Sequence, residues 1–341
     1  MAEYTKRELA GRGTPEGAIA RWLNGFREKG GRREIRRKTK LLLLGQRLND
    51  GFLFKIAIYI ILASVAVLYV SPLLYMLSTS FKEVSDMLDP AVKWIPTRYK
   101  LQNYTDAVTG LNYYKALGHT GFMAVSAALL QVGSCALAGY AFARLYVPFG
   151  KVLFGIVLLT FLVPVQTMAI PLFVLYSKLG WLNSPLPFLV PALFAQGIKG
   201  ALFVVIFRQF FSTLPKEMEE SARIDGAGAL RIYWKIMLPL SRPAMLIVFL
   251  FSLVWHWNAY FEPSLYLKND SFLAMATQLD QMQANLNFKA GAGGGLAAGQ
   301  FDLNEPLKMA ASLLVILPPL LVYMVAQNYF VQGIERTGLV E

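Results

Sequence analysis

Few residues in this chain have the types that catalyse reactions or bind metals. The two histidines, His119 and His256, lie far apart in apolar runs, and each fits a core or interfacial position better than a ligand or a base. The single cysteine, Cys135, forms no intrachain disulfide and no cysteine-rich metal site. No phosphate-binding glycine loop ending in Gly-Lys-Ser/Thr is present. We therefore expect no catalytic, cofactor-binding or metal-binding residue, and the chain is not expected to bind or hydrolyse ATP itself.

Polar residues within apolar runs are the remaining candidates for binding a solute. Lys199 would cost about 2.5–3.5 kcal/mol at the centre of a membrane span, so we expect it near an interface or lining a polar path, where it could pair with Glu262. Uncharged amides could bind a solute hydroxyl or bridge helices. Pro164 and Pro171 predict a kink that would act as a hinge. The candidate residues for a solute path or its gate are Pro164, Gln166, Lys199, Asn258 and Glu262.

One long polar segment, residues 212–242, interrupts the apolar second half of the chain. Thr213 is predicted to cap a helix that has Pro215 and several acidic residues in its first turn. The pair Asp225-Gly226 predicts the end of that helix, because glycine tolerates the positive φ of a tight turn. A second helix is then expected to run to Pro239. The corner between them is rich in small residues, so it is predicted to be a docking surface, or else a linker resting on lipid headgroups.

The elements that position these residues are long apolar runs. The chain of 341 residues is 55% hydrophobic and only 16% charged, which indicates an integral membrane protein. A helix needs roughly 20 apolar residues to cross a hydrocarbon core. Six runs meet this length, the fourth interrupted by Lys199, so we predict an all-α membrane protein with six transmembrane helices. The predicted spans are 56–80, 116–143, 152–177, 186–207, 243–261 and 309–334.

Charge distribution predicts the orientation of these helices. Most of the 33 Lys and Arg residues fall in the N-terminal tail, the 144–151 connection and the 212–242 segment with its borders. By the positive-inside rule, both termini and the polar segment are cytoplasmic. The net charge of +12 then faces membrane lipid, which removes nucleic acid as a partner.

Two connecting regions have distinctive compositions. Residues 1–52 form a basic tail in which 15–29 predict an amphipathic helix on an anionic membrane surface, the alternative being a tail without structure. Residues 53–341 form the transmembrane part. Its longest outer connection, 268–308, contains a glycine-rich run at 290–295 that predicts a mobile loop.

The polar segment carries a motif. Its sequence from Glu220 to Ala227 resembles the cytoplasmic EAA loop of ABC-importer permeases, Glu-Ala-Ala-x-x-Asp-Gly-Ala, with Ser221 in place of the middle alanine. In that family this loop is the coupling helix that sits in a groove of the ATPase subunit. The resemblance implies that Glu220 pairs with a basic residue of the ATPase and that Gly226 sets the bend. The implied coupling residues are Glu220, Ser221, Ala222, Asp225, Gly226 and Ala227.

The resemblance extends over roughly residues 55–337. Short stretches match carbohydrate-uptake permeases of the maltose type in order and spacing, and the six-span pattern is most similar to their smaller "G" subunit. The chain departs from that pattern at His119-Thr120, where the family has Asn-Ser, and at Ala259, where it has an acidic or polar residue. These departures concern the solute and not the class. The matching stretches are 80–82, 94–96, 101–104, 138–144, 163–166, 170–172, 208–211, 257–258 and 329–333.

The resemblance implies a function and a set of partners. The chain would be the type-1 transmembrane domain of an ABC importer in the inner membrane of a prokaryote, moving a carbohydrate and not itself an enzyme. Implied partners are a second homologous permease, two ATPase subunits and an external solute-binding protein, whose cleft the 268–308 loop would probe. Three alternatives remain: an importer of a non-sugar solute, a non-transporting anchor that recruits a cytoplasmic partner, and an ion-coupled transporter. The last is disfavoured because only Lys199 is charged at mid-membrane and no clear repeat is found.

Overall fold

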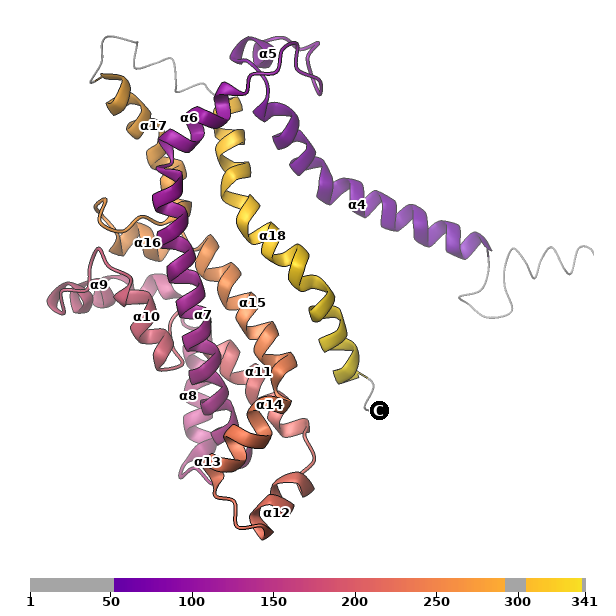
Figure 1. Ribbon diagram of the computed structural model, residues 1–341, viewed down its shortest axis with the longest axis vertical. Helices are drawn as coiled ribbons and strands as arrows, with labels where there is room; N and C mark the ends of the chain where they lie inside the picture. The colour runs from indigo at the N-terminus through magenta and orange to yellow at the C-terminus, as the bar shows by residue number, and fades with distance from the viewer. Residues whose placement is uncertain (1–51, 292–304, 339–341) are drawn as a thin grey trace, which may run out of the picture. The chain divides into compact units, whose positions relative to one another are not determined.

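The computed structural model describes residues 52–291 and 305–338 of the chain, and every regular element in these ranges is a helix (Figure 1). The all-α prediction is confirmed for this part of the protein. The tail 1–51, with its predicted surface helix, and the glycine-rich run after Gly291 lie outside the described residues. The chain divides into two compact units, Met1–Leu74 and Tyr75–Glu341.

Three described helices are long and apolar enough to cross a membrane: α4 (Phe52–Ser80), α7 (Tyr113–Arg144) and α18 (Glu305–Gly338). The number rises to five if each of two bent helix pairs counts as one span. These helices contain the predicted first, second and sixth spans. The count of six spans and the cytoplasmic location of both termini stay predictions.

Helix α4 is apolar around its whole circumference. Tyr59, Leu68 and Tyr69 are each at least 70% exposed, and they lie on different sides of the helix. The hydroxyls of Ser64 and Ser71 donate to carbonyls of the preceding turn, at 2.8 and 3.2 Å. A helix with apolar side chains on all sides and internally satisfied polar groups is suited to surrounding lipid.

Helix α7 is the centre of the second unit. It packs against α10 (Leu186–Leu193), α11 (Gly200–Thr213) and α15 (Arg242–Asn258). Small residues on α7 permit the close approach of these neighbours. At Gly139 an added Cβ would lie 2.5 Å from the Cβ of Phe207 and 2.8 Å from the backbone nitrogen of Arg208, both on α11. The buried alanines of α7 are Ala116, Ala124, Ala127, Ala128 and Ala136.

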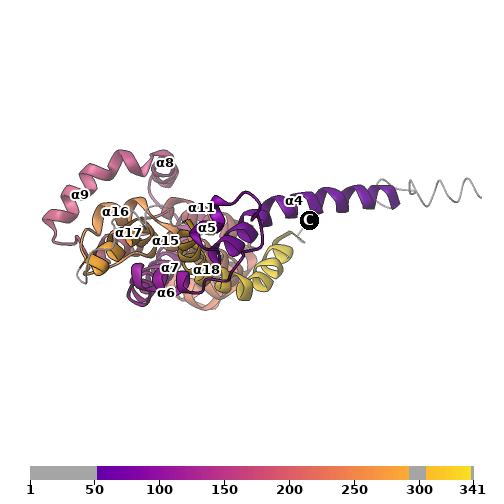
Figure 2. The same ribbon diagram turned by 90° about the horizontal axis from the view of Figure 1, so that it is seen from above.

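The predicted third span is sharply bent at Pro164. Helix α8 (Gly150–Leu162) is followed by a 3₁₀ turn, η1 (Val165–Met168), and by α9 (Ala169–Lys178), with a bend of 94° between the two parts. The change of direction is larger than the predicted kink. Pro171 does not contribute to it, because it lies in the first turn of α9, where a missing N–H breaks no helical bond. Viewed from above, α8 and α9 lie at one edge of the second unit (Figure 2).

The predicted fourth span, 186–207, is wrong as a continuous helix. The chain leaves α10 at Phe194 and re-enters a helix only at Gly200, and Ala195, Gly197 and Lys199 between them have positive φ. Irregular backbone at membrane depth requires hydrogen-bond partners from the protein. They come from α7, because the Gln131 side-chain amide donates to the carbonyls of Gln196 and Ile198, both at 3.0 Å.

The predicted fifth span corresponds to α15, which follows a 74° bend from the segment Ala229–Leu240. That segment consists of α13 (Ala229–Ile232), a π-helical turn η2 (Tyr233–Met237) and α14 (Leu238–Leu240). Pro239 therefore lies inside the last short helix, and the chain turns two residues later, at Ser241.

Helices α6 (Gln102–Gly110) and α17 (Met275–Gly291) both pack against α7. Helix α5 (Val84–Leu88) contacts α18, and α16 (Phe261–Tyr266) contacts α9. The connection 268–308, predicted as a mobile loop, is thus helical in its first half. Met275, Met282 and Leu286 of α17 are buried in a cluster with residues of α6 and α18.

Candidate functional site

The predicted docking segment contains a short helix, α12 (Glu217–Ile224), near the end of α7 opposite to α6 and α17 (Figure 1). The prediction that Thr213 caps this helix is wrong. Thr213 is the last residue of α11, and its hydroxyl donates to the Phe210 carbonyl at 2.7 Å. Because a residue before proline avoids helical geometry, Leu214 is extended and α12 begins only after Pro215.

The predicted end of α12 at Asp225-Gly226 is confirmed. Gly226 has a φ of +79°, its N–H bonds to the Arg223 carbonyl at 3.0 Å, and the Ala227 N–H bonds to the Ala222 carbonyl at 2.9 Å. This pair of bonds is a Schellman motif, which favours glycine at the left-handed position. The positive φ therefore favours glycine at this position. Steric crowding does not require it, because nothing lies within 4 Å of the position that a Cβ would occupy.

The six predicted coupling residues divide between two faces. Ala222 is buried in the core cluster that includes Tyr140 and Phe211, and Ala227 is half-buried. The other four are exposed and available to a partner: Glu220, Ser221, Asp225 and Gly226. The last residue of α12, Ile224, adds an apolar side chain that is 87% exposed. Exposed apolar groups bordered by polar residues are typical of a protein-binding site.

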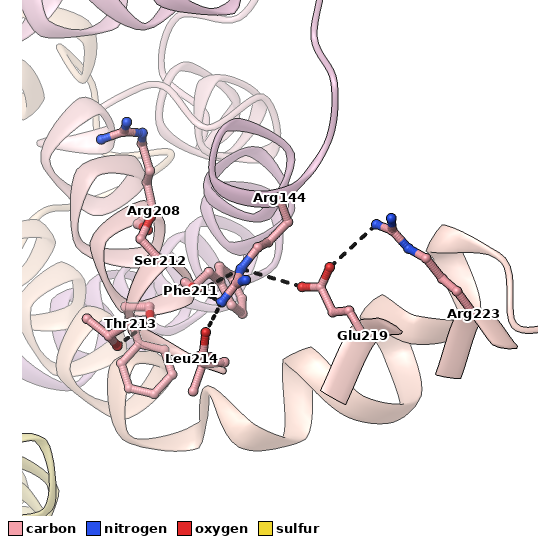
Figure 3. A network of polar contacts seen from close by, with 9 residues as sticks. Arg144, Arg208, Phe211, Ser212, Thr213, Leu214, Glu219 and Arg223 are labelled. Carbon is pink, nitrogen blue, oxygen red and sulfur yellow. Dashed lines mark hydrogen bonds and ion pairs between the residues drawn. The ribbon is translucent and has the colours of Figure 1, made fainter. Parts of the chain in front are cut away.

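A buried ion pair ties α12 to the rest of the fold (Figure 3). The Nε of Arg144 lies 3.5 Å from Oε1 of Glu219, and the two side chains are only 4% and 6% exposed. The same guanidinium donates to the Phe211 carbonyl from Nε at 2.9 Å and from Nη2 at 2.6 Å. Its Nη2 also donates to the Leu214 carbonyl. The second carboxylate oxygen of Glu219 lies 3.5 Å from Arg223, whose side chain is largely exposed. Sequence reasoning missed this pair, because 75 positions separate its members and no local spacing signals it.

A cavity of about 830 Å³ lies between the bent α8–α9 pair, the broken α10–α11 pair and α16. It brings together Pro164, Gln166, Lys199 and Glu262, four of the five residues predicted to line a solute path. The fifth, Asn258, does not line it and is exposed at the end of α15. The aromatic side chains in its wall are Phe161, Tyr176, Trp181, Phe188, Phe194 and Tyr266. An apolar wall with a few convergent polar groups is typical of a small-molecule site.

Lys199 lies at the break in the fourth predicted span. It has a left-handed φ of 59°, and its Nζ lies 5.8 Å from the ring centres of both Phe161 and Trp255. The ion pairs in the described ranges are Arg144–Glu219, Arg223–Glu219 and Lys308–Glu305. The suggested pairing of Lys199 with Glu262 is therefore absent, and the ammonium group is stabilised by aromatic faces.

The two histidines have different environments. Nδ1 of His119 accepts a hydrogen bond from the Leu273 N–H at 2.9 Å, and its ring stacks on Phe272, which confirms a structural role. Nδ1 of His256 is 2.8 Å from the Ser252 carbonyl, and the residue borders the cavity. His256 is buried, as predicted for a core position, but its Nε2 has no hydrogen-bond partner among the described residues.

Comparison with known proteins gives consistent matches. Residues 135–336 match the family described as binding-protein-dependent transport system inner membrane component. A polygalacturonan/rhamnogalacturonan transport system permease of Bacillus subtilis is 30% identical over 82% of this chain and 96% of its own length. An osmoprotective compounds uptake permease of Synechocystis is 29% identical over 87% of this chain and 97% of its own.

The fold also matches a solved structure. The crystal structure of a bacterial ABC transporter involved in import of the acidic polysaccharide alginate has a chain that superposes with a TM-score of 0.68. The alignment covers 82% of this chain and 96% of that one, at 24% identity.

Proposed function

Since the chain belongs to the inner membrane components of binding-protein-dependent transport systems, we propose that it is the carbohydrate permease subunit of an ABC importer. Members of this family are multi-pass membrane subunits without catalytic activity, and ATP hydrolysis belongs to separate subunits. The importer also comprises a partner permease and a solute-binding protein. For this chain we propose one homologous permease partner and two ATPase subunits.

The observation that carries the proposed solute class is the lining of the cavity. Sugar rings present apolar faces and hydroxyl edges, and the cavity offers aromatic walls together with the polar side chains of Gln166, Lys199 and Glu262. Two similar proteins, the Bacillus permease and the alginate importer, are named for acidic polysaccharides. Lys199, which has no carboxylate partner among the described residues, would attract such a solute, so we propose an acidic sugar or oligosaccharide.

Coupling to the ATPase is proposed for the exposed face of α12. Glu220, Ser221 and Asp225 would contact the ATPase groove, and Gly226 would hold the turn that presents them. Ala222 and Ala227 face the core, and their small side chains would allow the segment that contains α12 to pack closely against it. Pro164, at the bend between α8 and η1, is the proposed gate residue.

A second candidate is an importer of a non-sugar solute, which the relative named for osmoprotective compounds favours. A non-transporting anchor would need the docking face but no cavity with polar groups, so the cavity argues against it.

The test begins with purification of the tagged chain from its native membrane and mass identification of what stays bound. The recovered complex, with its binding protein, is reconstituted in vesicles, and uptake of galacturonate oligomers is compared with uptake of neutral gluco-oligosaccharides of equal length. We expect ATP-dependent uptake of the acidic oligomers, with about tenfold less uptake by Lys199→Met than by Lys199→Arg. Glu220→Lys should abolish ATPase stimulation while leaving membrane insertion intact.

Preferential uptake of the neutral oligomers would refute the acidic class. If the complex contains an ATPase and a second permease but takes up neither kind of oligosaccharide, the result would favour an importer of a non-sugar solute. Recovery of the chain without an ATPase would support the anchor.

A further inference from the structure

Helix α12 is joined to its neighbours by non-helical chain on both sides. Leu214 to Lys216 separate it from α11, and Asp225 to Gly228 separate it from α13. A helix of eight residues between two such connections would swing freely if nothing else held it. A freely swinging docking helix could not move the membrane helices when a partner displaces it.

Side-chain contacts hold α12 in place, and the first of them involves Arg144. It is the last residue of α7, and its guanidinium donates to the carbonyls of Phe211 and Leu214 at the end of α11. The last carbonyls of a helix have no partner within that helix, so this contact satisfies them. One side chain thus joins the ends of α7 and α11.

Glu219 extends the attachment to α12. Its carboxylate pairs with Arg144 from the inner face of α12, where both groups are shielded from water. A charge removed from water depends on its partner far more than an exposed charge does. Water therefore cannot easily take the place of either partner, and the three helix ends are held as one body (Figure 3).

An apolar layer lies behind the pair. The ring of Tyr140 packs edge-on against Phe211, with 5.7 Å between ring centres, and against Tyr233, with 5.2 Å between ring centres. Ala222 of α12 belongs to the same buried cluster. These contacts join α7, α11, α12 and η2. Close-packed interiors have low compressibility and transmit strain, so this layer provides a physical route by which a displacement of α12 can reach α7 and α11.

We infer that Arg144 and Glu219 are positioning residues that make α12 move together with α7 and α11, so that displacement of the docking helix by an ATPase reaches the solute cavity. The inference rests on the proposed function. Neither residue needs to touch the ATPase or the solute. Their loss should uncouple ATP hydrolysis from transport and leave both the docking face and the cavity intact.

The test uses the reconstituted complex with its binding protein and three readouts: ATPase subunit retained, basal ATP hydrolysis, and solute taken up per ATP. For Glu219→Gln and Arg144→Gln we expect normal retention, basal hydrolysis at or above wild type, and about tenfold less uptake per ATP. Arg144→Lys, which keeps the charge but not the forked geometry, should fall between these variants and wild type. The double variant should resemble each single variant, because the two residues act as a pair.

Arg223→Gln is the matched control. It removes another arginine from the same carboxylate, but Arg223 lies on α12 itself, in an ion pair that stays within this helix. Its uptake per ATP should stay within about twofold of wild type.

The inference is overturned if Glu219→Gln and Arg144→Gln keep wild-type uptake per ATP. It is also overturned if they lose the ATPase subunit, since the pair would then serve assembly only. An equal loss of uptake per ATP in Arg223→Gln would also overturn it, because the effect would then come from the charge of α12 and not from its attachment to Arg144. A wild-type complex without stimulated hydrolysis would instead refute the proposed function.

Discussion

At the scale of single residues, the close packing of α7 against α11 depends on Gly139. Its missing side chain leaves room for Phe207 and for the backbone of Arg208. Gly139→Ala should separate the two helices, and overpacking of this kind costs about 1–3 kcal/mol. We expect a lower melting temperature in detergent, measured by tryptophan fluorescence. Gly133→Ala, on the same helix with nothing within 4 Å, is the control. Equal melting of the two variants would contradict the packing argument.

At the scale of elements, the broken fourth span depends on Gln131 of α7. Its amide donates to the Gln196 and Ile198 carbonyls, and its Oε1 accepts from the Ser252 hydroxyl at 2.6 Å. Gln131→Leu takes this partner away from three groups inside the protein, and each buried group left unpaired costs about 1–3 kcal/mol. We expect lower thermal stability and, because the break carries Lys199, a raised KM for uptake.

Leu129→Ala, at a nearby exposed position on α7, should change neither quantity. If Gln131→Leu lowered stability but left KM unchanged, the break would be a structural feature without influence on the solute cavity.

Elements with strong local signals could be predicted from the sequence. Apolar length located α4, α7 and α18, and glycine chemistry located the end of α12 at Gly226. The break at 194–199 could not be predicted in detail, because its hydrogen bonds come from Gln131, more than 60 positions earlier. Its signal in the sequence is Lys199, which interrupts an otherwise apolar run.

The candidate sites were predictable to different degrees. The exposed residues of α12 follow from a local motif, and four cavity residues follow from polarity within apolar runs. The Arg144–Glu219 pair follows from neither, since its members lie on α7 and α12, which are distant in the sequence and meet only in the folded chain. The polarity of Asn258 places it in the predicted path, but it lies at the end of α15 and does not line the cavity.

At the scale of the whole molecule, α7 is long enough for its two ends to lie on opposite sides of the membrane. Its 32 residues span about 48 Å at 1.5 Å per residue, more than the ~30 Å hydrocarbon core. Tyr114 is exposed at its start, and Arg144 at its end contacts α12 through Glu219. From the positive-inside rule we predict that the end with α12 faces the cytoplasm. Tyr114 should therefore face the outside and Ile224 the cytoplasm.

Thiol labelling tests this orientation directly, because the chain's single cysteine, Cys135, is fully buried and gives an unlabelled wild type. In Ile224→Cys, a membrane-impermeant maleimide should react in inverted vesicles and not in intact cells. In Tyr114→Cys it should react in intact cells and not in sealed inverted vesicles. Labelling of Ile224→Cys from the outside would place α12 beyond the reach of any ATPase, and with it both the docking face and the Arg144–Glu219 link would lose their proposed roles.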